Sequence, residues 1–125
     1  MKNSHSKRSL YRLAILSLSL FALAVLSSAR TPTTTSVNIV NNSNREIRNL
    51  YLSHVNADDW GSNQLSNGAT IAPGQSHNLS NVACDQQQVK VIGEDQDGCF
   101  VSTVVACGGN STWTITNNTA ADCGQ

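Results

Sequence analysis

Two adjacent carboxylates stand directly before a tryptophan in the stretch ADDWGSNQL, residues 57–65. An exposed Trp60 beside Asp58 and Asp59 could stack on a sugar ring or lie over a cation, with the carboxylates accepting hydrogen bonds from the ligand. The same residues also suit a structural corner, in which an Asp caps its own backbone turn and the indole covers the end of a small domain. We expect the structural corner first and the rim of a recognition site second.

Catalysis by this loop is disfavoured by its geometry. Adjacent residues of an extended chain point to opposite sides, so Asp58 and Asp59 are poorly placed to flank one scissile bond. The sequence also contains no G-x-S-x-G, no H-E-x-x-H and no Gly-rich phosphate loop. We therefore expect a non-enzymatic protein without a cofactor. A small secreted hydrolase or inhibitor is an alternative, and an inhibitor would use a disulfide-held loop such as 94–98.

The stretch EDQDG, residues 94–98, matches the end of a calcium-binding loop. Asp95 and Asp97 fit two positions of the D-x-D-x-D-G pattern. However, Gly93 occupies the first ligand position, and no closing Glu follows at the expected spacing. Acidic residues also gather at hairpin tips because they stay hydrated there. The sequence therefore predicts a turn without a metal, and Asp95 and Asp97 are the secondary candidates for a calcium site.

Residues 1–29 have the three parts of a secretory signal peptide. Basic residues precede the uncharged apolar run LAILSLSLFALAVL at 13–26, and the small residues Ser27, Ser28 and Ala29 follow it. The run is shorter than the stretch of about 20 apolar residues that a membrane-spanning helix needs. We expect cleavage after Ala29, a secreted or periplasmic protein, and no stable membrane anchor after cleavage.

Removal of the signal peptide would leave an acidic chain. Four basic residues then face eight Asp and Glu residues, which gives a formal net charge of −4. Nucleic acids and anionic membranes attract clustered cations, which this chain lacks. We expect no nucleic-acid partner and consider a glycan or an extracellular protein as the partner. The leading hypothesis is a binding or interaction module, and the alternative is a carbohydrate- or membrane-recognition module that uses residues 58–60.

An all-β domain must position these residues. Apolar and polar residues alternate in VNIV (37–40) and in STWTIT (111–116), the pattern of strands with one buried face. Between them lie three segments rich in β-branched and aromatic residues, although the first would also suit a helical turn. These segments are 46–55, 88–93 and 99–107.

Turn signals separate these segments at short intervals. Pro73 and Gly74 occupy the two central positions of a predicted type II turn. We expect an antiparallel β-sandwich of about six or seven strands, of immunoglobulin-like or Greek-key type. The domain would span 37–125, after a flexible lead-in at 30–36.

Four cysteines in a small exported domain predict two disulfides. If the segments around EDQDG form a hairpin with a two-residue loop, Cys84 and Cys107 face each other at its open end. Cys99 then lies roughly 26 Å along the strand from Cys107, whereas bonded cysteines have Cα atoms within about 7 Å of each other. The pairing that satisfies this hairpin is Cys84–Cys107 with Cys99–Cys123.

The same register assigns faces to the two hairpin strands. It places Val89 and Val91 on one side together with Phe100, Val104 and Ala106, and we predict that this side is core. The neighbouring strands would complete the core with Val37, Ile39, Trp113 and Ile115.

The order of the short motifs resembles that of a group of small exported prokaryotic β-domains to which no activity is assigned. In this chain the pattern reads NNSNREIRNLYLS, then DDWGSNQL, then PGQS, then a cysteine on each side of VKVIGEDQDG. The resemblance spans about 37 to 116, and it implies a β-sandwich in which Cys84 pairs with Cys107. Asn44 stands where the pattern usually has Gly, and the other two cysteines are additional to it.

Overall fold

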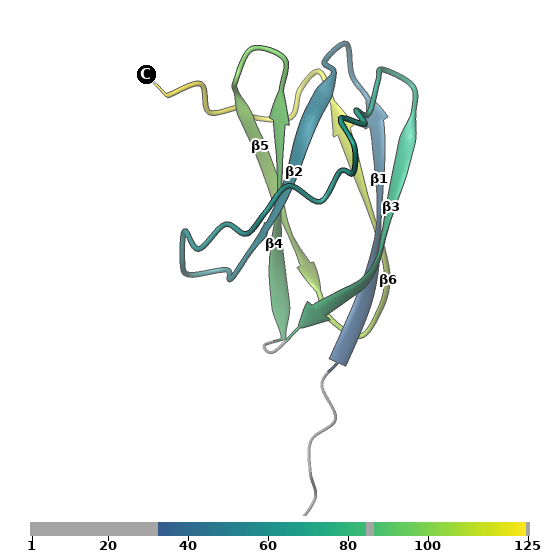
Figure 1. Ribbon diagram of the computed structural model, residues 1–125, viewed down its shortest axis with the longest axis vertical. Helices are drawn as coiled ribbons and strands as arrows, with labels where there is room; N and C mark the ends of the chain where they lie inside the picture. Colours follow the sequence, from purple (N-terminus) through teal and green to yellow (C-terminus); the bar gives the residue numbers. More distant parts are fainter. Residues whose placement is uncertain (1–32, 85–86, 125) are drawn as a thin grey trace, which may run out of the picture. The chain divides into compact units, whose positions relative to one another are not determined.

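The computed structural model describes residues 33–84 and 87–124, and within them six strands form two three-stranded sheets (Figure 1). The strands are β1 (Thr33–Asn42), β2 (Ile47–Ser53), β3 (Ser76–Cys84), β4 (Gln88–Asp95), β5 (Phe100–Ala106) and β6 (Gly109–Thr116). The sheet orders are β3-β1-β6 and β2-β4-β5. The predicted all-β class is confirmed. The predicted signal peptide lies outside the described residues, within which no helix has the length and apolar character needed to cross a bilayer.

One pair of strands departs from the predicted antiparallel arrangement. β1 runs parallel to β6, from Thr35 opposite Gly109 to Asn42 opposite Thr116. The pairs β1–β3, β2–β4 and β4–β5 are antiparallel. Parallel neighbours cannot be joined by a tight turn, and here the whole second sheet lies between β1 and β6 in the chain.

β1 begins earlier than the sequence analysis indicated. Residues 33–36, predicted to belong to a flexible lead-in, are part of the strand, and the first three of them pair with β3. Thr35 is buried, and its hydroxyl donates a hydrogen bond of 2.7 Å to the carbonyl oxygen of Gly109. Threonine favours strands, and its bonded hydroxyl can be buried at little cost. The start of β1 was therefore not predicted, because its residues are polar.

A bulge in β3 hides its periodicity, and the sequence analysis did not single it out as a strand. Thr35 lies opposite Val82, whereas Val37 lies opposite Leu79, so the register shifts between these pairs. Asn81 lies in this bulge and has a φ of 55°, a left-handed conformation that Asn tolerates better than most residues. Strict alternation of apolar and polar residues therefore fails along this strand.

The inner faces of the two sheets share one hydrophobic cluster, the arrangement expected of a sandwich. The β2–β3 connection also contributes to this cluster through Leu65 and Ile71. Among the predicted core residues, the structure buries Val37, Ile39, Val89, Val91, Trp113 and Ile115.

The β4–β5 hairpin has a different register from the predicted one. Glu94 lies opposite Phe100 instead of Asp97, and the loop consists of residues 96–98. Gly98 has a φ of 76°, the left-handed conformation that ends many three-residue hairpin loops. The predicted two-residue loop was therefore wrong.

This change of register turns β5 over. An odd shift moves every side chain of a strand to the opposite face. Val101 and Val105 therefore enter the core, and the prediction that Phe100, Val104 and Ala106 are core residues was wrong. These three residues lie on the outer face of the β2-β4-β5 sheet.

Both disulfides join the cysteines that the sequence analysis paired. The Cα atoms are 6.0 Å apart in Cys84–Cys107 and 4.1 Å apart in Cys99–Cys123. The first bond has a different structural setting from the predicted one. Cys84 ends β3 in one sheet and Cys107 follows β5 in the other, so the bond joins the two sheets instead of two strands of one hairpin.

Asn41 is a fully buried polar residue at the end of β1. Its side-chain amide donates to the carbonyl oxygens of Arg45, at 2.7 Å, and Ile71, at 2.9 Å. Its side-chain oxygen accepts hydrogen bonds from the backbone N–H and the hydroxyl of Ser43. Asn41 thereby fixes the β1–β2 turn against the β2–β3 connection.

Gly93 lies on the inner face of β4, where a Cβ atom would be 3.3 Å from the Cγ2 atoms of both Ile47 and Val101. We expect Gly93→Val to lower the free energy of unfolding by about 1–3 kcal/mol, because the added methyl groups overpack this face. Urea denaturation measures the change. The control is Gly61→Val, since a Cβ atom at Gly61 meets no atom within 4 Å. Equal stability of the two variants would contradict the packing described.

Candidate functional site

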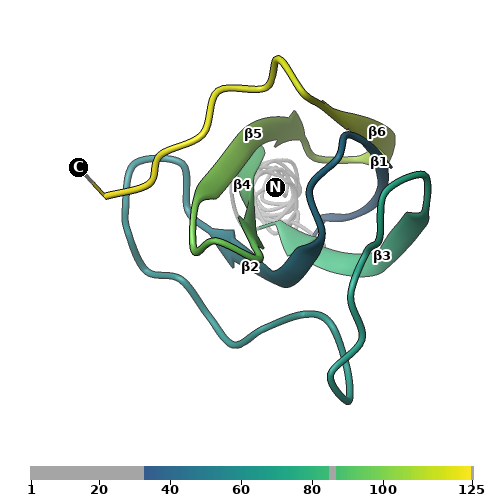
Figure 2. The same cartoon turned by 90° about the horizontal axis from the view of Figure 1, so that it is seen from above.

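The connection between β2 and β3 runs around the outside of β2 (Figure 2). The N–H of Gly61 donates to the carbonyl oxygen of Leu52 at 3.3 Å, and the N–H of Gln64 donates to that of Leu50 at 2.7 Å. Leu65 then inserts into the core. The connection therefore covers the free edge of β2, which would otherwise present unpaired backbone groups, and it fixes the backbone next to Trp60.

Trp60 lies across the outer face of the β2-β4-β5 sheet. Its ring centroid is 5.6 Å from that of Tyr51 on β2 and 4.9 Å from that of Phe100 on β5. β4 is the strand between these two, so the indole lies over β4. Ile92 on β4 lies opposite Tyr51, is not part of the core cluster and is nevertheless only 1% exposed. Trp60 therefore has the packing role that a structural corner requires.

The same indole remains accessible to solvent. Trp60 has 36% of its surface exposed. The ring planes make angles of 32° with Tyr51 and 74° with Phe100, and these contacts fix the orientation of the indole. The indole is therefore packed against two rings and is still partly open to a ligand.

Glu94 on β4 forms a hydrogen-bond network beside this aromatic cluster. The Nδ2 of Asn49 and the hydroxyl of Tyr51 both donate to its Oε2, at 3.1 and 3.2 Å. Burial raises the pKa of Tyr51, and the negative charge and hydrogen bond of Glu94 raise it further. Tyr51 is therefore kept protonated as a donor, while Oε1 of Glu94 can accept a hydrogen bond from a ligand.

The sequence did not predict Tyr51 and Phe100 as the ring neighbours of Trp60, nor the hydrogen bonds that Glu94 forms beside them. The correct hairpin register would have placed Phe100 opposite Glu94, whereas the pairing of Asn49 with Glu94 depends on the register between β2 and β4. The sequence offered no comparable signal for the position of Trp60, because that depends on the path of the whole β2–β3 connection.

Asp59 holds the first turn of the β2–β3 connection. Its Oδ1 accepts hydrogen bonds of 3.0 Å from both the Ser53 hydroxyl and the His54 N–H, and its Oδ2 contacts Nδ1 of the His54 ring. The bonds from the side chain and backbone of His54, followed by that from Ser53, lower the pKa of Asp59 to about 2. Asp59 therefore serves the loop itself, while its neighbour Asp58 is exposed.

We expect the Asp59 carboxyl to titrate near pH 2, below its ordinary value of 3.8, in an NMR titration. Because folding lowers this pKa, the stability that Asp59 contributes is present above about pH 4 and is lost as the pH falls toward 2. Ser53→Ala removes one donor and should raise the midpoint. A wild-type midpoint near 3.8 would contradict the described role of Asp59.

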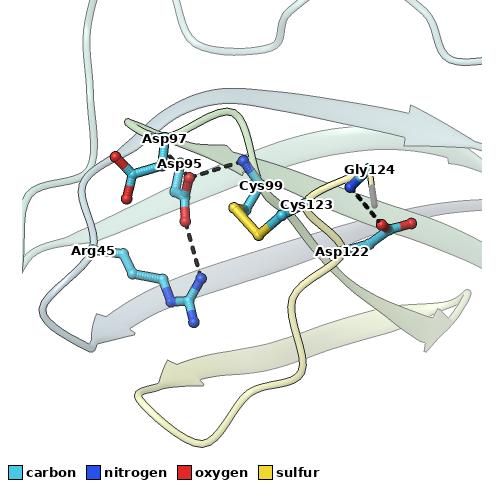
Figure 3. Close-up of a disulfide and its surroundings, with 7 residues drawn as sticks. All are labelled: Arg45, Asp95, Asp97, Cys99, Asp122, Cys123 and Gly124. Atoms are coloured by element: carbon cyan, nitrogen blue, oxygen red, sulfur yellow. Dashed lines mark hydrogen bonds and ion pairs between the residues drawn. A yellow bond between two sulfur atoms is a disulfide. The ribbon is translucent and has the colours of Figure 1, made fainter.

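Asp95 is committed to the β4–β5 turn (Figure 3). Its Oδ1 accepts hydrogen bonds from the N–H groups of Asp97 and Cys99, at 2.9 and 3.0 Å, and its Oδ2 accepts one of 3.0 Å from Arg45. Burial raises the pKa of Asp95, but the bonds from Cys99, Asp97 and Arg45 outweigh burial and hold it below its ordinary value. Both oxygens therefore face hydrogen-bond donors. The described chain contains no group of three or more His, Cys, Asp or Glu residues that could hold a metal.

The tip of the β4–β5 turn is folded back onto the start of β2. The N–H of Gln96 donates to the carbonyl oxygen of Glu46 at 3.0 Å, and the N–H of Glu46 donates to Oε1 of Gln96 at 2.7 Å. This contact holds the turn against the body of the domain. Residues 94–98 are therefore held in place by Glu46 at one side of the loop.

We expect Asp95→Asn to lower the free energy of unfolding by about 1.5–3 kcal/mol at pH 7, because it removes a charge-assisted bond and leaves Arg45 unpaired. Asp97→Asn, in the same turn but exposed, should change it by less than about 0.5 kcal/mol. Chemical denaturation compares the two variants. A rise in melting temperature with calcium that both variants abolish would restore the calcium hypothesis.

A pocket of about 160 Å³ lies between β2 and the Cys84 end of β3, beside the His54–Asp59 pair. Sites for small organic ligands usually enclose about 300–1,000 Å³. This pocket is therefore a poor candidate for such a ligand, and the face around Trp60 is the stronger candidate.

No protein-family model matches this chain, and no curated protein sequence matches it. Among solved structures, an NMR structure of a protein from Eubacterium rectale is similar, with a TM-score of 0.47 and 16% sequence identity. The match covers 72% of this chain and 85% of that chain. It identifies neither a family nor a function.

Proposed function

We propose that this chain is a non-enzymatic binding module that acts outside the cytoplasm. Its binding surface is the outer face of the β2-β4-β5 sheet around Trp60. This surface, the Trp60 face, consists of Asn49, Tyr51, Trp60, Glu94 and Phe100. The observation that carries the proposal is that Trp60 is fixed by two aromatic neighbours and still exposes 36% of its surface.

Fixed aromatic side chains favour binding for a thermodynamic reason. A ligand that contacts a mobile side chain must pay for ordering it, whereas a preorganised ring adds contact area at little entropic cost. Tryptophan is enriched at binding surfaces because it combines a large apolar area with one hydrogen-bond donor. The contacts of Trp60 with Tyr51 and Phe100 supply this preorganisation.

Two further observations support an extracytoplasmic and non-enzymatic role. The disulfides Cys84–Cys107 and Cys99–Cys123 suit an oxidising compartment. Asp59 and Asp95 are each bonded within their own turn, whereas a glycosidase needs two carboxyl groups that flank one bond. The immunoglobulin-like or Greek-key sandwich expected from the sequence is part of the same proposal, since such folds bind through sheet faces and end loops.

Of the ligands considered for residues 58–60, a carbohydrate suits this face better than a membrane. Asp58, Asp59 and Glu94 place negative charge near Trp60, and that charge repels anionic lipid headgroups. A neutral ligand with hydroxyl groups meets no such repulsion and can donate hydrogen bonds to carboxylates.

The test compares Trp60→Ala with Val104→Ala in co-sedimentation with isolated cell envelopes of the producing organism. Val104 is the matched control, since it is 43% exposed on the same sheet face and lies outside the aromatic cluster. We expect Trp60→Ala to bind the envelopes at least about tenfold more weakly, because aromatic residues often dominate the binding energy of a surface. Val104→Ala should bind them like the wild type.

Stability must be measured alongside binding. Trp60→Ala removes the contacts with Tyr51 and Phe100, so the free energy of unfolding of this variant should fall by about 1–3 kcal/mol without loss of the fold. Equal envelope binding by the two variants, or no binding by the wild type, would overturn the proposal.

A further inference from the structure

The three rings of the Trp60 face are not arranged as a cation-binding cage. In a cage, several rings surround one point, and each turns its face toward the cation. Here Trp60 lies between Tyr51 and Phe100, and these rings contact the indole itself. Tyr51 and Phe100 are only partly exposed. Trp60 is therefore the ring of the three that is most open to a ligand.

The polar groups beside this plane form an ordered chain. Asn63 donates to the side-chain oxygen of Asn49 at 2.8 Å, and Asn49 donates to Oε2 of Glu94 at 3.1 Å. Tyr51 donates to the same Oε2 at 3.2 Å. These bonds orient the Glu94 carboxylate from one side, and Oε1 is left as a hydrogen-bond acceptor beside Tyr51 and Phe100, the two rings that contact the indole.

A carboxylate acceptor beside a flat ring selects among ligand classes. Carboxylates accept strong hydrogen bonds from neutral hydroxyl donors and repel anions. A protein partner would need about 800 Å² of contact on each side, far more than one indole and its neighbours offer. A pyranose whose hydroxyls are equatorial presents a flat C–H face and a rim of hydroxyl donors, which fits a ring flanked by an acceptor.

We propose that the Trp60 face binds a neutral carbohydrate built from equatorially substituted pyranose rings. One sugar ring stacks its C–H face on Trp60, and a hydroxyl of that ring donates to Oε1 of Glu94. The inference rests on the proposed binding function and adds the ligand class and the residue that orients the ligand. Asp58 and Asp59, which the sequence singled out, are not needed for this contact.

The test is an NMR titration of the exported chain with cellohexaose, chitohexaose and maltohexaose at millimolar concentration. Each of the two tryptophans gives an indole N–H signal. The Trp60 signal should shift with cellohexaose or chitohexaose, while the signal of the buried Trp113 serves as the internal reference. Maltohexaose, whose α-linkages prevent an extended flat chain, should produce smaller shifts.

Glu94→Gln is the main variant, because it keeps the shape of the side chain and removes its charge. Its dissociation constant for the better ligand should rise by about three- to tenfold, while Val104→Ala should leave it unchanged. Trp60→Ala should abolish the shifts. If that variant does not fold, Glu94→Gln with a wild-type-like spectrum still tests the inference.

The outcomes separate this inference from the binding function. Envelope binding that depends on Trp60, together with no oligosaccharide-induced shift at its indole, would overturn the carbohydrate ligand and leave the binding function intact. The same holds if phosphatidylcholine vesicles or tetramethylammonium shift the Trp60 signal and the sugars do not. Envelope binding that does not depend on Trp60 would overturn the binding function. Unchanged sugar affinity of Glu94→Gln would remove Glu94 as the orienting residue.

Discussion

The three-residue loop of the β4–β5 hairpin is the constraint on which the rest of the structure depends. Asp95 accepts hydrogen bonds across the loop, and Gly98 supplies the left-handed residue that closes it. The resulting register directs Val101 and Val105 into the core and turns Phe100 outward. A loop one residue shorter would exchange these faces and would remove the ring against which Trp60 packs.

The second sheet protects both of its edges with neighbouring chain. The β2–β3 connection bonds to β2, and the C-terminal tail bonds to β5 through two hydrogen bonds between Phe100 and Asp122, of 2.7 and 2.8 Å. The Cys99–Cys123 disulfide fastens that tail. Because exposed edges invite pairing with other chains, these contacts protect the edge of β2 and the Phe100 end of β5.

Packing and exposure are combined in Trp60. The indole packs against Tyr51 and Phe100, so the side chain contributes to folding even without a ligand. The bonds of Asp59 to Ser53 and His54 hold the turn that precedes it. A binding surface built in this way needs little reorganisation when a ligand binds. Residues 58–60 can therefore serve both as a structural corner and as part of a recognition site.

The sequence by itself determined the all-β class and the buried residues of the most regular strands, such as Val37, Ile39, Trp113 and Ile115. These follow from local alternation and composition, which do not depend on distant neighbours. The predicted disulfide pairs are also present, but they were predicted from a hairpin register that the structure corrects. Only the tertiary structure decided the hairpin register, the strand at Thr35, the bulge at Asn81 and the partners of Trp60. Each of these depends on a single-residue difference in loop or strand length, or on contacts between distant segments, and short-range periodicity carries no information about either.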